Sequence, residues 1–329
     1  MKKVGIIGAG AWGIALGISL EKNGCAVCLW HHDKQKLGKL NSERKTSKLD
    51  NITISEKIKF TDSLEEVLKS DTLIYASPTQ EFAAITRKIH MIKNISKPLV
   101  IACKGIDINS NKLLTEISKE NLPECIPVIL SGPGFAIDLA NGHPIAITLA
   151  SDSHITLESV GHLLASNNFR PYFNDDVVGV QIGGALKNVI AIATGIAMGK
   201  KLGDGAVASL ITRGMNEIIT FGLMMGAKKE TFFGLSGLGD LVLTATNLKS
   251  RNTQLGNQIG ISGGLKHSSK DLTEGFYTTN AVYNISRKKK IKLPIIDAVY
   301  NILYNSGSVE NEIGLLMNRP LRDENLNRD

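Results

Sequence analysis

The chain has 329 residues, of which 43% are hydrophobic and 21% charged, and its formal net charge is +7. This length and composition are typical of a globular protein of about two domains that can bury a sizeable core, and they give no reason to expect disorder. The positive charge favours an anionic ligand or partner. The one dense basic run, at residues 287–290, is more typical of a solvated helix end than of a nucleic-acid interface, because aromatic residues make up only 5% of the chain.

The N-terminus allows two interpretations, a secretory signal peptide or a dinucleotide-binding loop. Two lysines precede an uncharged stretch at residues 4–20, which is how signal peptides begin. The same stretch places Gly8, Gly10 and Gly13 between a strand pattern at 4–7 and a helix pattern at 14–22, and a second strand pattern follows at 26–30. We therefore predict a cofactor loop. Gly8 allows the turn, Gly10 admits a pyrophosphate, and Gly13 lets the helix pack closely on the strand.

Apolar runs recur through the first half of the chain, with helical patterns between them. They lie at residues 4–7, 26–30, 72–76, 99–102, 128–130 and 145–149. This alternation predicts βαβ units and a parallel sheet. After residue 173 only helical patterns follow, at 177–198, 206–225, 240–246, 278–288 and 295–304. The sequence thus predicts an α/β domain at 1–180 and an all-α domain at 181–329.

The four cysteines do not form a disulfide framework or a recognisable metal site. Cys25 and Cys28 form C-x-x-C, but no second such pair or histidine pair accompanies them. Along a strand, residues three apart point to opposite faces, so two small buried hydrophobic residues are the favoured interpretation. We expect no metal and a reducing, cytoplasmic compartment.

The residues after the second strand pattern bear on the choice between NAD and NADP. An NAD-specific site usually has an acidic residue there for the ribose hydroxyls. This chain has His31 and His32, then Asp33 and Lys34. The partly basic surroundings suit a 2′-phosphate, so we predict that NADP is favoured over NAD.

One charge, Lys187, interrupts the apolar helix pattern at 177–198. Polar and glycine residues around it argue against a membrane span, and an almost wholly apolar helix is usually buried within a protein. A lysine there is either a structural residue at the domain junction or a group that exchanges protons, because desolvation lowers the pKa of an ammonium group.

Further polar residues follow in the all-α half. A glycine-rich turn ends at Asp240, which we expect to cap a helix, and Thr244 falls on the same helical face. Ser250, Arg251 and Asn252 offer a hydroxyl, a guanidinium and an amide in sequence. Such a tripeptide suits a phosphate group. Taken alone, however, it is more typical of a surface loop.

Eight motifs in this order resemble the bacterial-type NAD(P)-dependent glycerol-3-phosphate dehydrogenases. They are GAGAWGIALG at the start, then ACKGI, SGPGFA, GALKNVIAIA, ITRG, LSGLGDLVLTAT, KSRN and TEG. The resemblance covers nearly the whole chain. It implies reversible reduction of dihydroxyacetone phosphate to sn-glycerol 3-phosphate, which supplies glycerophospholipid synthesis. It also implies an N-terminal Rossmann-type domain, a C-terminal helical domain of the 6-phosphogluconate dehydrogenase-like type, and a site between them.

The resemblance also implies roles for individual residues. Lys187 would be the general acid/base, Lys104 would stabilise developing oxygen charge, and Asp240 would set the charge state of Lys187. Substrate contacts are implied for Lys104, Gly132, Asn188, Asp240, Thr244, Ser250, Arg251 and Asn252. Together with the glycine loop and the second strand end, the expected cofactor contacts are Gly8, Gly10, Ala11, Trp12, Gly13, His31, His32, Lys104, Ala136, Arg251, Leu272 and Glu274.

The chain departs from the family pattern at three places. Ala11 and Gly134 stand where the family commonly has hydroxyl side chains, and Leu272 and Thr273 stand where it commonly has valines. We therefore expect an active enzyme with some loss of cofactor affinity.

Three alternatives differ in class: a dehydrogenase of the 3-hydroxyacid or 6-phosphogluconate type, a non-catalytic NAD(P)-sensing protein, and a membrane-anchored protein. Asp240 with residues 250–252 favours a small phosphate ester as substrate. Retention of Lys104 and Lys187 favours an enzyme. The expected partner is thus a phosphorylated triose or glycerol, with no nucleic acid and no membrane span, and the sequence leaves a homodimer open.

Overall fold

The structure is a computed structural model that describes residues 1–265, 273–321 and 323–324. It divides into two compact units. Unit 1 comprises Met1–Lys104 and Lys112–Val180, and unit 2 comprises Gly105–Asn111 and Gln181–Asp329. The short segment Gly105–Asn111 groups with the helical unit although it comes from the first half of the chain, and no sequence pattern indicated this.

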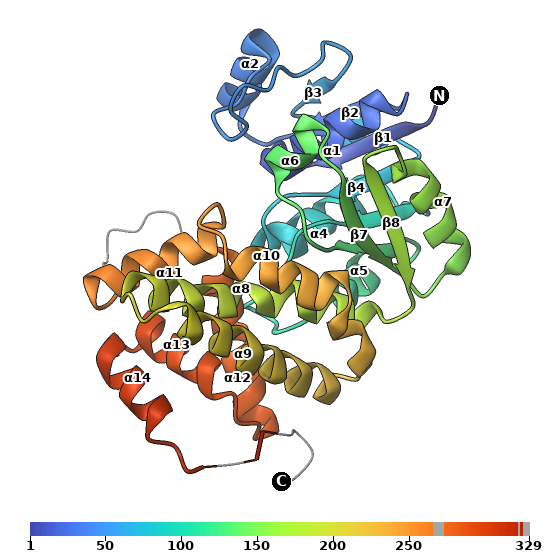
Figure 1. Ribbon diagram of the computed structural model, residues 1–329. Coiled ribbons are helices and arrows are strands. Elements are labelled where there is room, and N and C mark those ends of the chain that lie inside the picture. The colour runs from blue at the N-terminus through green and yellow to red at the C-terminus, as the bar shows by residue number, and fades with distance from the viewer. Residues whose placement is uncertain (266–272, 322, 325–329) are drawn as a thin grey trace. The chain divides into compact units, whose positions relative to one another are not determined.

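The described part of unit 1 contains an eight-stranded sheet in the order β3-β2-β1-β4-β5-β6-β7-β8 (Figure 1). Neighbouring strands are parallel except β6 and β7, which are antiparallel. The strands are β1 (Lys3–Ile7), β2 (Ala26–Trp30), β3 (Lys59–Thr61), β4 (Thr72–Tyr75), β5 (Pro98–Ile101), β6 (Ile126–Ser131), β7 (Ile145–Ala150) and β8 (Phe169–Asn174). The predicted parallel sheet is therefore confirmed, with one antiparallel pair and with β3 and β8 added.

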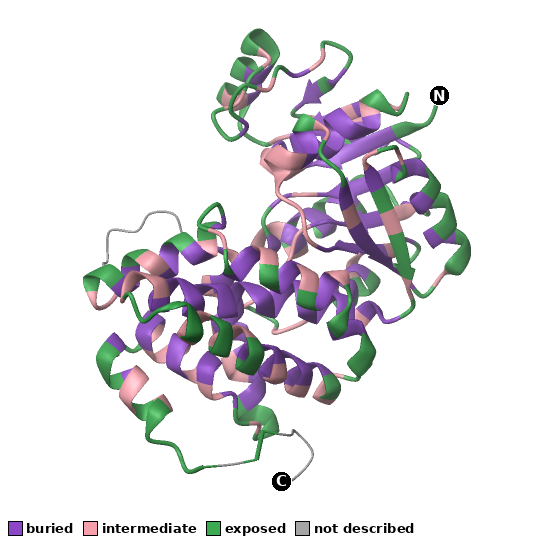
Figure 2. Ribbon diagram, viewed as in Figure 1, coloured by how far each residue is buried: buried purple, intermediate pink, exposed green. Residues whose placement is uncertain are grey.

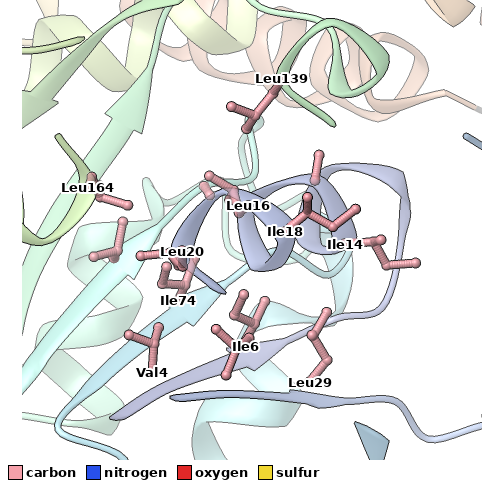
Figure 3. Packing of buried hydrophobic residues seen from close by; sticks show 14 of the residues in the cluster. Val4, Ile6, Ile14, Leu16, Ile18, Leu20, Leu29, Ile74, Leu139 and Leu164 are labelled. Carbon is pink, nitrogen blue, oxygen red and sulfur yellow. The ribbon is translucent and has the colours of Figure 1, made fainter. Parts of the chain in front are cut away.

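Helices cover both faces of this sheet, which explains why its central strands are continuous apolar runs. Alternate side chains enter two cores. Ile6 packs with the residues of α1 (Ala11–Lys22) (Figure 3). Ile7 belongs to the core on the opposite face. The first core also takes residues from α2 (Lys34–Glu43), α6 (Ala136–Asn141) and α7 (His154–Leu164), and the second from α3 (Leu64–Val67), α4 (Phe82–Ile92) and α5 (Leu114–Asn121).

The strand order reverses at β1, because β2 and β4 lie on its two sides. In open α/β sheets, ligands bind outside the carboxyl ends of the strands at such a reversal. The turn after β1 lies at this point, since the Gly8 N–H donates to the carbonyl oxygen of Trp30 at the end of β2. The topology therefore puts the glycine loop at the expected ligand position of the sheet.

Unit 2 is helical in its described residues. Its helices are α8 (Val177–Gly199), which begins in unit 1, α9 (Asp204–Met224), α10 (Asp240–Ala245), α11 (Arg251–Ser262), α12 (Glu274–Lys289), α13 (Pro294–Tyr304) and α14 (Val309–Met317). By length and composition α8 could cross a membrane, but 89% of its most apolar window is buried inside the protein (Figure 2). A helix in the core of a protein can have the same length and apolar composition as a membrane-spanning helix. The burial of α8 within the protein therefore accounts for its apolar character.

Helices α8 and α11 approach closely through glycines on both sides. A Cβ atom at Gly256 would overlap the carbonyl oxygen of Ile192, and one at Gly195 would overlap that of Thr253. The same arrangement repeats one turn later at Gly199. This contact fixes the position of α11 relative to α8, the helix that carries Lys187.

Candidate functional site

Three glycines shape the turn between β1 and α1, each in a different way. Gly8 has a φ of +121°, and a Cβ there would lie 2.6 Å from the backbone nitrogen of Ser77. A Cβ at Gly13 would overlap the carbonyl oxygen of Gly8, so the helix could not pack so closely with any larger residue. A Cβ at Gly10 would meet nothing within 4 Å. The open space at Gly10 fits the approach of a ligand to the backbone.

The N-terminus of α1 faces this space with uncapped donors. Gly10 is the N-cap residue and has no side chain to accept from the first turn of the helix. The first N–H groups of a helix have no partner within it, and they carry its positive end. Ala11, Trp12 and Gly13 supply these groups, so this turn has the chemistry to hold a diphosphate.

The loops after β5 and β6 bring two further predicted residues together. Lys104 Nζ donates to the carbonyl oxygen of Gly132 at 3.1 Å. In the same loop, the Cβ position of Gly134 lies 3.7 Å from the indole ring of Trp12, and Ala136 begins α6. Residues predicted from separate motifs of unit 1 therefore lie along the same strand ends.

In unit 2, Lys187 lies in the buried middle of α8 with its side chain only 9% exposed. Its Nζ donates to Asp240 Oδ1 at 2.5 Å and to Thr244 Oγ1 at 2.7 Å, both on α10. Burying an ammonium group is unfavourable unless it is paired and hydrogen-bonded. The carboxylate and the hydroxyl meet that requirement, so the cation is stable in an apolar helix.

The structure corrects the predicted capping role of Asp240. Asp240 is the first residue of α10, Gly239 is the N-cap residue, and no side chain caps the helix. A π-helical turn, Leu235–Gly239, runs directly into α10, and the Gly239 N–H already donates to Gly234. Since helical backbone precedes α10, Asp240 instead directs its carboxylate to Lys187.

Asn252 connects three helices through its side-chain amide. Its Nδ2 donates to Asn188 Oδ1 on α8 at 2.9 Å, and its Oδ1 accepts from the Gly275 N–H on α12 at 3.0 Å. The side chain of Asn252 is thus held by protein groups, and its contact with substrate stays a prediction. Glu274 is the first residue of α12 and precedes Gly275. The hydrogen bond from the Gly275 N–H to Asn252 therefore also fixes the backbone position of Glu274.

Residues 250–252 begin a helix and are not a surface loop. Ser250 is the N-cap residue of α11, and its Oγ accepts from the Thr253 N–H. Arg251 is the first residue of α11 and is exposed. The serine was a readable N-cap signal, but the Asn-, Gln- and Gly-rich composition of α11 hid the helix. Leu272, also predicted for the cofactor, lies outside the described residues.

Comparison with known proteins decides the family. The profile of the NAD-dependent glycerol-3-phosphate dehydrogenase N-terminus matches residues 3–156, and that of the C-terminus matches residues 176–314. The chain belongs to the glycerol-3-phosphate dehydrogenase family. The predicted family, fold class and enzyme class are therefore confirmed.

Individual members of the family match this chain over nearly its whole length. Glycerol-3-phosphate dehydrogenase (NAD(P)+) of Afipia carboxidovorans is 42% identical over 323 residues, covering 98% of each chain. That of Bacillus subtilis is 39% identical and covers 97% of this chain and 95% of the relative. The crystal structure of the Coxiella burnetii family member superposes with a TM-score of 0.93 at 32% identity, over 97% of this chain and 99% of that one. D-mandelate dehydrogenase, at 13% identity and a TM-score of 0.63, shares the fold alone.

Proposed function

We propose that the chain reversibly reduces dihydroxyacetone phosphate to sn-glycerol 3-phosphate with NAD(P)H in the cytoplasm, and so supplies glycerophospholipid synthesis. The observation that carries this proposal is the buried Lys187 ammonium, held by Asp240 and Thr244 within a chain of this family. An ammonium group that two partners hold in a fixed orientation is suited to donate a proton to a carbonyl oxygen within hydrogen-bond reach.

Unit 1 is proposed to bind the cofactor. The open backbone at Gly10 and the uncapped N–H groups of Ala11 and Trp12 fit the diphosphate. When bound, NAD(P)H supplies the hydride that the carbonyl carbon of the substrate accepts.

Lys187 is proposed to donate the proton. Its Nζ–H would donate a hydrogen bond to the carbonyl oxygen and transfer the proton as negative charge develops there. Asp240 and Thr244 would orient the amine that remains, and a solvent proton would restore the ammonium. In the opposite direction the amine would take the hydroxyl proton. Lys104 is proposed to stabilise the same developing charge.

The substrate phosphate is proposed to bind at the start of α11. Ser250 caps the Thr253 N–H, so the backbone N–H groups of Arg251 and Asn252 are left as donors of the first turn. With the Arg251 guanidinium they would form a charge-assisted set for a phosphate ester. Asn188 is positioned beside them through its contact with Asn252.

Two measurements test the proposal. Purified protein is mixed with dihydroxyacetone phosphate, and oxidation of NADPH and of NADH is followed separately. A folded protein that binds nucleotide but oxidises neither cofactor would overturn the proposed reaction.

The second measurement tests the role of Lys187. Lys187→Ala should lower kcat by roughly 10²–10⁴, the usual range for a lost general acid, and leave the Kd for the nucleotide within about twofold. Lys200→Ala is the matched control, because Lys200 follows α8 and pairs with Glu310 at the surface. Equal losses of kcat and nucleotide affinity in Lys187→Ala would contradict the acid/base role.

A further inference from the structure

The end of β2 and the start of α2 bring basic side chains together. Lys36 Nζ lies 3.1 Å from His31 Nε2, and the rings of His31 and His32 stack with their centroids 4.7 Å apart. Lys48, from the loop after α2, acts electrostatically on both His31 and Lys36. We call His31, His32, Lys36 and Lys48 the β2-end cluster.

Within the β2-end cluster, basic groups lower one another's pKa because each disfavours a positive charge on its neighbours. Burial, followed by the charges of Lys36, His32 and Lys48, lowers the pKa of His31 to about 4 against the opposing effect of Asp33. Burial and then Lys48 also lower the pKa of Lys36. Positive groups gathered in this way are stabilised when an anion binds among them.

Two donors approach the His31 ring, but a neutral ring can accept a hydrogen bond from only one of them. The Asp33 N–H approaches Nδ1 at 3.0 Å, while the Lys36 ammonium approaches Nε2. A neutral imidazole has one acceptor nitrogen, so whichever tautomer is present, one of these donors faces a ring N–H. An oxyanion accepts from several donors at once and would resolve this conflict.

Nearby carboxylates are committed elsewhere. Asp33 Oδ1 accepts from the N–H groups of Gln35 and Lys36 and so caps α2. The ion pairs of this region in the described residues are Lys34–Asp62 and Arg44–Glu56, and they leave out the lysines of the β2-end cluster. Among the described residues, these carboxylates therefore do not neutralise the lysines of the β2-end cluster.

The β2-end cluster lies beside the glycine turn, because Gly8 donates to Trp30, the last residue of β2. In dinucleotide-binding folds the adenosine ribose lies at the end of this strand. Given the proposed NAD(P) binding, we propose that Lys36, supported by His31 and Lys48, binds the 2′-phosphate of NADPH and makes the protein select NADP over NAD. Lys36 is thus a cofactor-specificity residue supplied by α2.

The test compares adenosine 2′,5′-bisphosphate with 5′-AMP by calorimetry on the full chain. The unsubstituted protein should bind the bisphosphate more tightly, and Lys36→Gln should reduce the ratio of the two affinities about tenfold or more, since loss of a charge-assisted contact is of this order. Lys57→Gln is the matched control, because it removes the same charge from a side chain that is also 84% exposed and is paired with Glu21. It should keep the affinity ratio within about twofold.

The outcomes separate this proposal from the proposed reaction. Equal affinity of the unsubstituted protein for the two probes would overturn this proposal, as would an affinity ratio of Lys36→Gln equal to that of Lys57→Gln. If Lys36→Gln does not fold, Lys48→Gln at the exposed loop replaces it, with a loss of at least about threefold in the ratio expected and no loss contradicting the proposal. None of these measurements uses dihydroxyacetone phosphate, so a failed reaction would appear separately as nucleotide binding without turnover.

Discussion

Gly134 lies in the loop between β6 and α6, where the family commonly carries a hydroxyl side chain. A Cβ atom there would lie 3.6 Å from Ile145 and 3.7 Å from Trp12, which are ordinary contact distances. Its φ is not in the left-handed region. The backbone and its neighbours therefore accept a side chain, and the hydroxyl is missing for no steric reason.

Gly134→Ser should therefore lower the KM for dihydroxyacetone phosphate roughly twofold to tenfold, because one added hydrogen bond contributes about 0.5–1.5 kcal/mol. Steady-state kinetics at saturating NADPH measure the change. Gly134→Ala adds the same Cβ without the hydroxyl and serves as the control. If the alanine variant changed KM as much as the serine variant, the effect would be steric and the hydrogen-bond explanation would be wrong.

The contact between α8 and α11 connects helix packing to the proposed substrate site. Gly195 and Gly256 let the two backbones touch, and α11 then presents Arg251 and Asn252 beside the helix that holds Lys187. Alanine is the better helix former by about 1 kcal/mol, so these glycines are unfavourable by propensity alone. Tertiary packing overrides that preference.

Gly256→Ala should lower the free energy of unfolding by about 1–3 kcal/mol, because its Cβ would overlap Ile192 and force the helices apart. Gly314→Ala on α14 is the control: its Cβ would meet nothing within 4 Å, and the change should stabilise by about 0.5–1 kcal/mol. Urea unfolding of both variants gives the comparison. A Gly256→Ala protein as stable as the Gly314→Ala protein would refute the packing argument.

Glu217 links α9 to α13 and makes stability depend on pH. Its two carboxylate oxygens accept from the N–H groups of Ile295 and Ile296, so it caps a helix whose own N-cap residue is Leu293. Burial nevertheless raises the pKa of Glu217 to about 7. A raised carboxyl pKa means that the folded state holds a proton that the unfolded chain releases from about pH 4.5 upward. Its stabilising contribution is therefore complete below that pH and is lost as the pH rises through 7.

Glu217→Gln should remove this part of the pH dependence. The difference in free energy of unfolding between the unsubstituted protein and Glu217→Gln should shift between pH 5 and pH 7, by at most about 1.4 kcal/mol per pH unit and in favour of Glu217 at the lower pH. Urea titrations at pH 5, 6, 7 and 8 measure it. A difference that stays constant over this range would show that Glu217 does not change its protonation there.

Local sequence was sufficient to predict an element wherever the physical reason for that element lies within a few neighbouring residues. Gly8 and Gly13 could be placed in a turn because their spacing follows a strand and precedes a helix, and the apolar runs of β1, β4 and β5 needed no distant information. β3 and β8 were missed because one has three residues and the other lies at the sheet edge with most of its side chains partly or fully exposed. Such segments have no apolar run to detect.

Relations between distant residues had to come from the folded chain. The sequence predicted a buried Lys187 that needs a partner, and the family resemblance named Asp240, but only the packing of α10 on α8 places both Asp240 and Thr244 on its Nζ. The capping role predicted for Asp240 was wrong because the preceding π-helical turn had no sequence signal. Lys36 likewise reaches His31 only when α2 folds back over the end of β2. Hydrophobic periodicity and turn chemistry act within a few residues and so can be read along the chain, whereas the partner of a buried charge is chosen by whichever element packs against it.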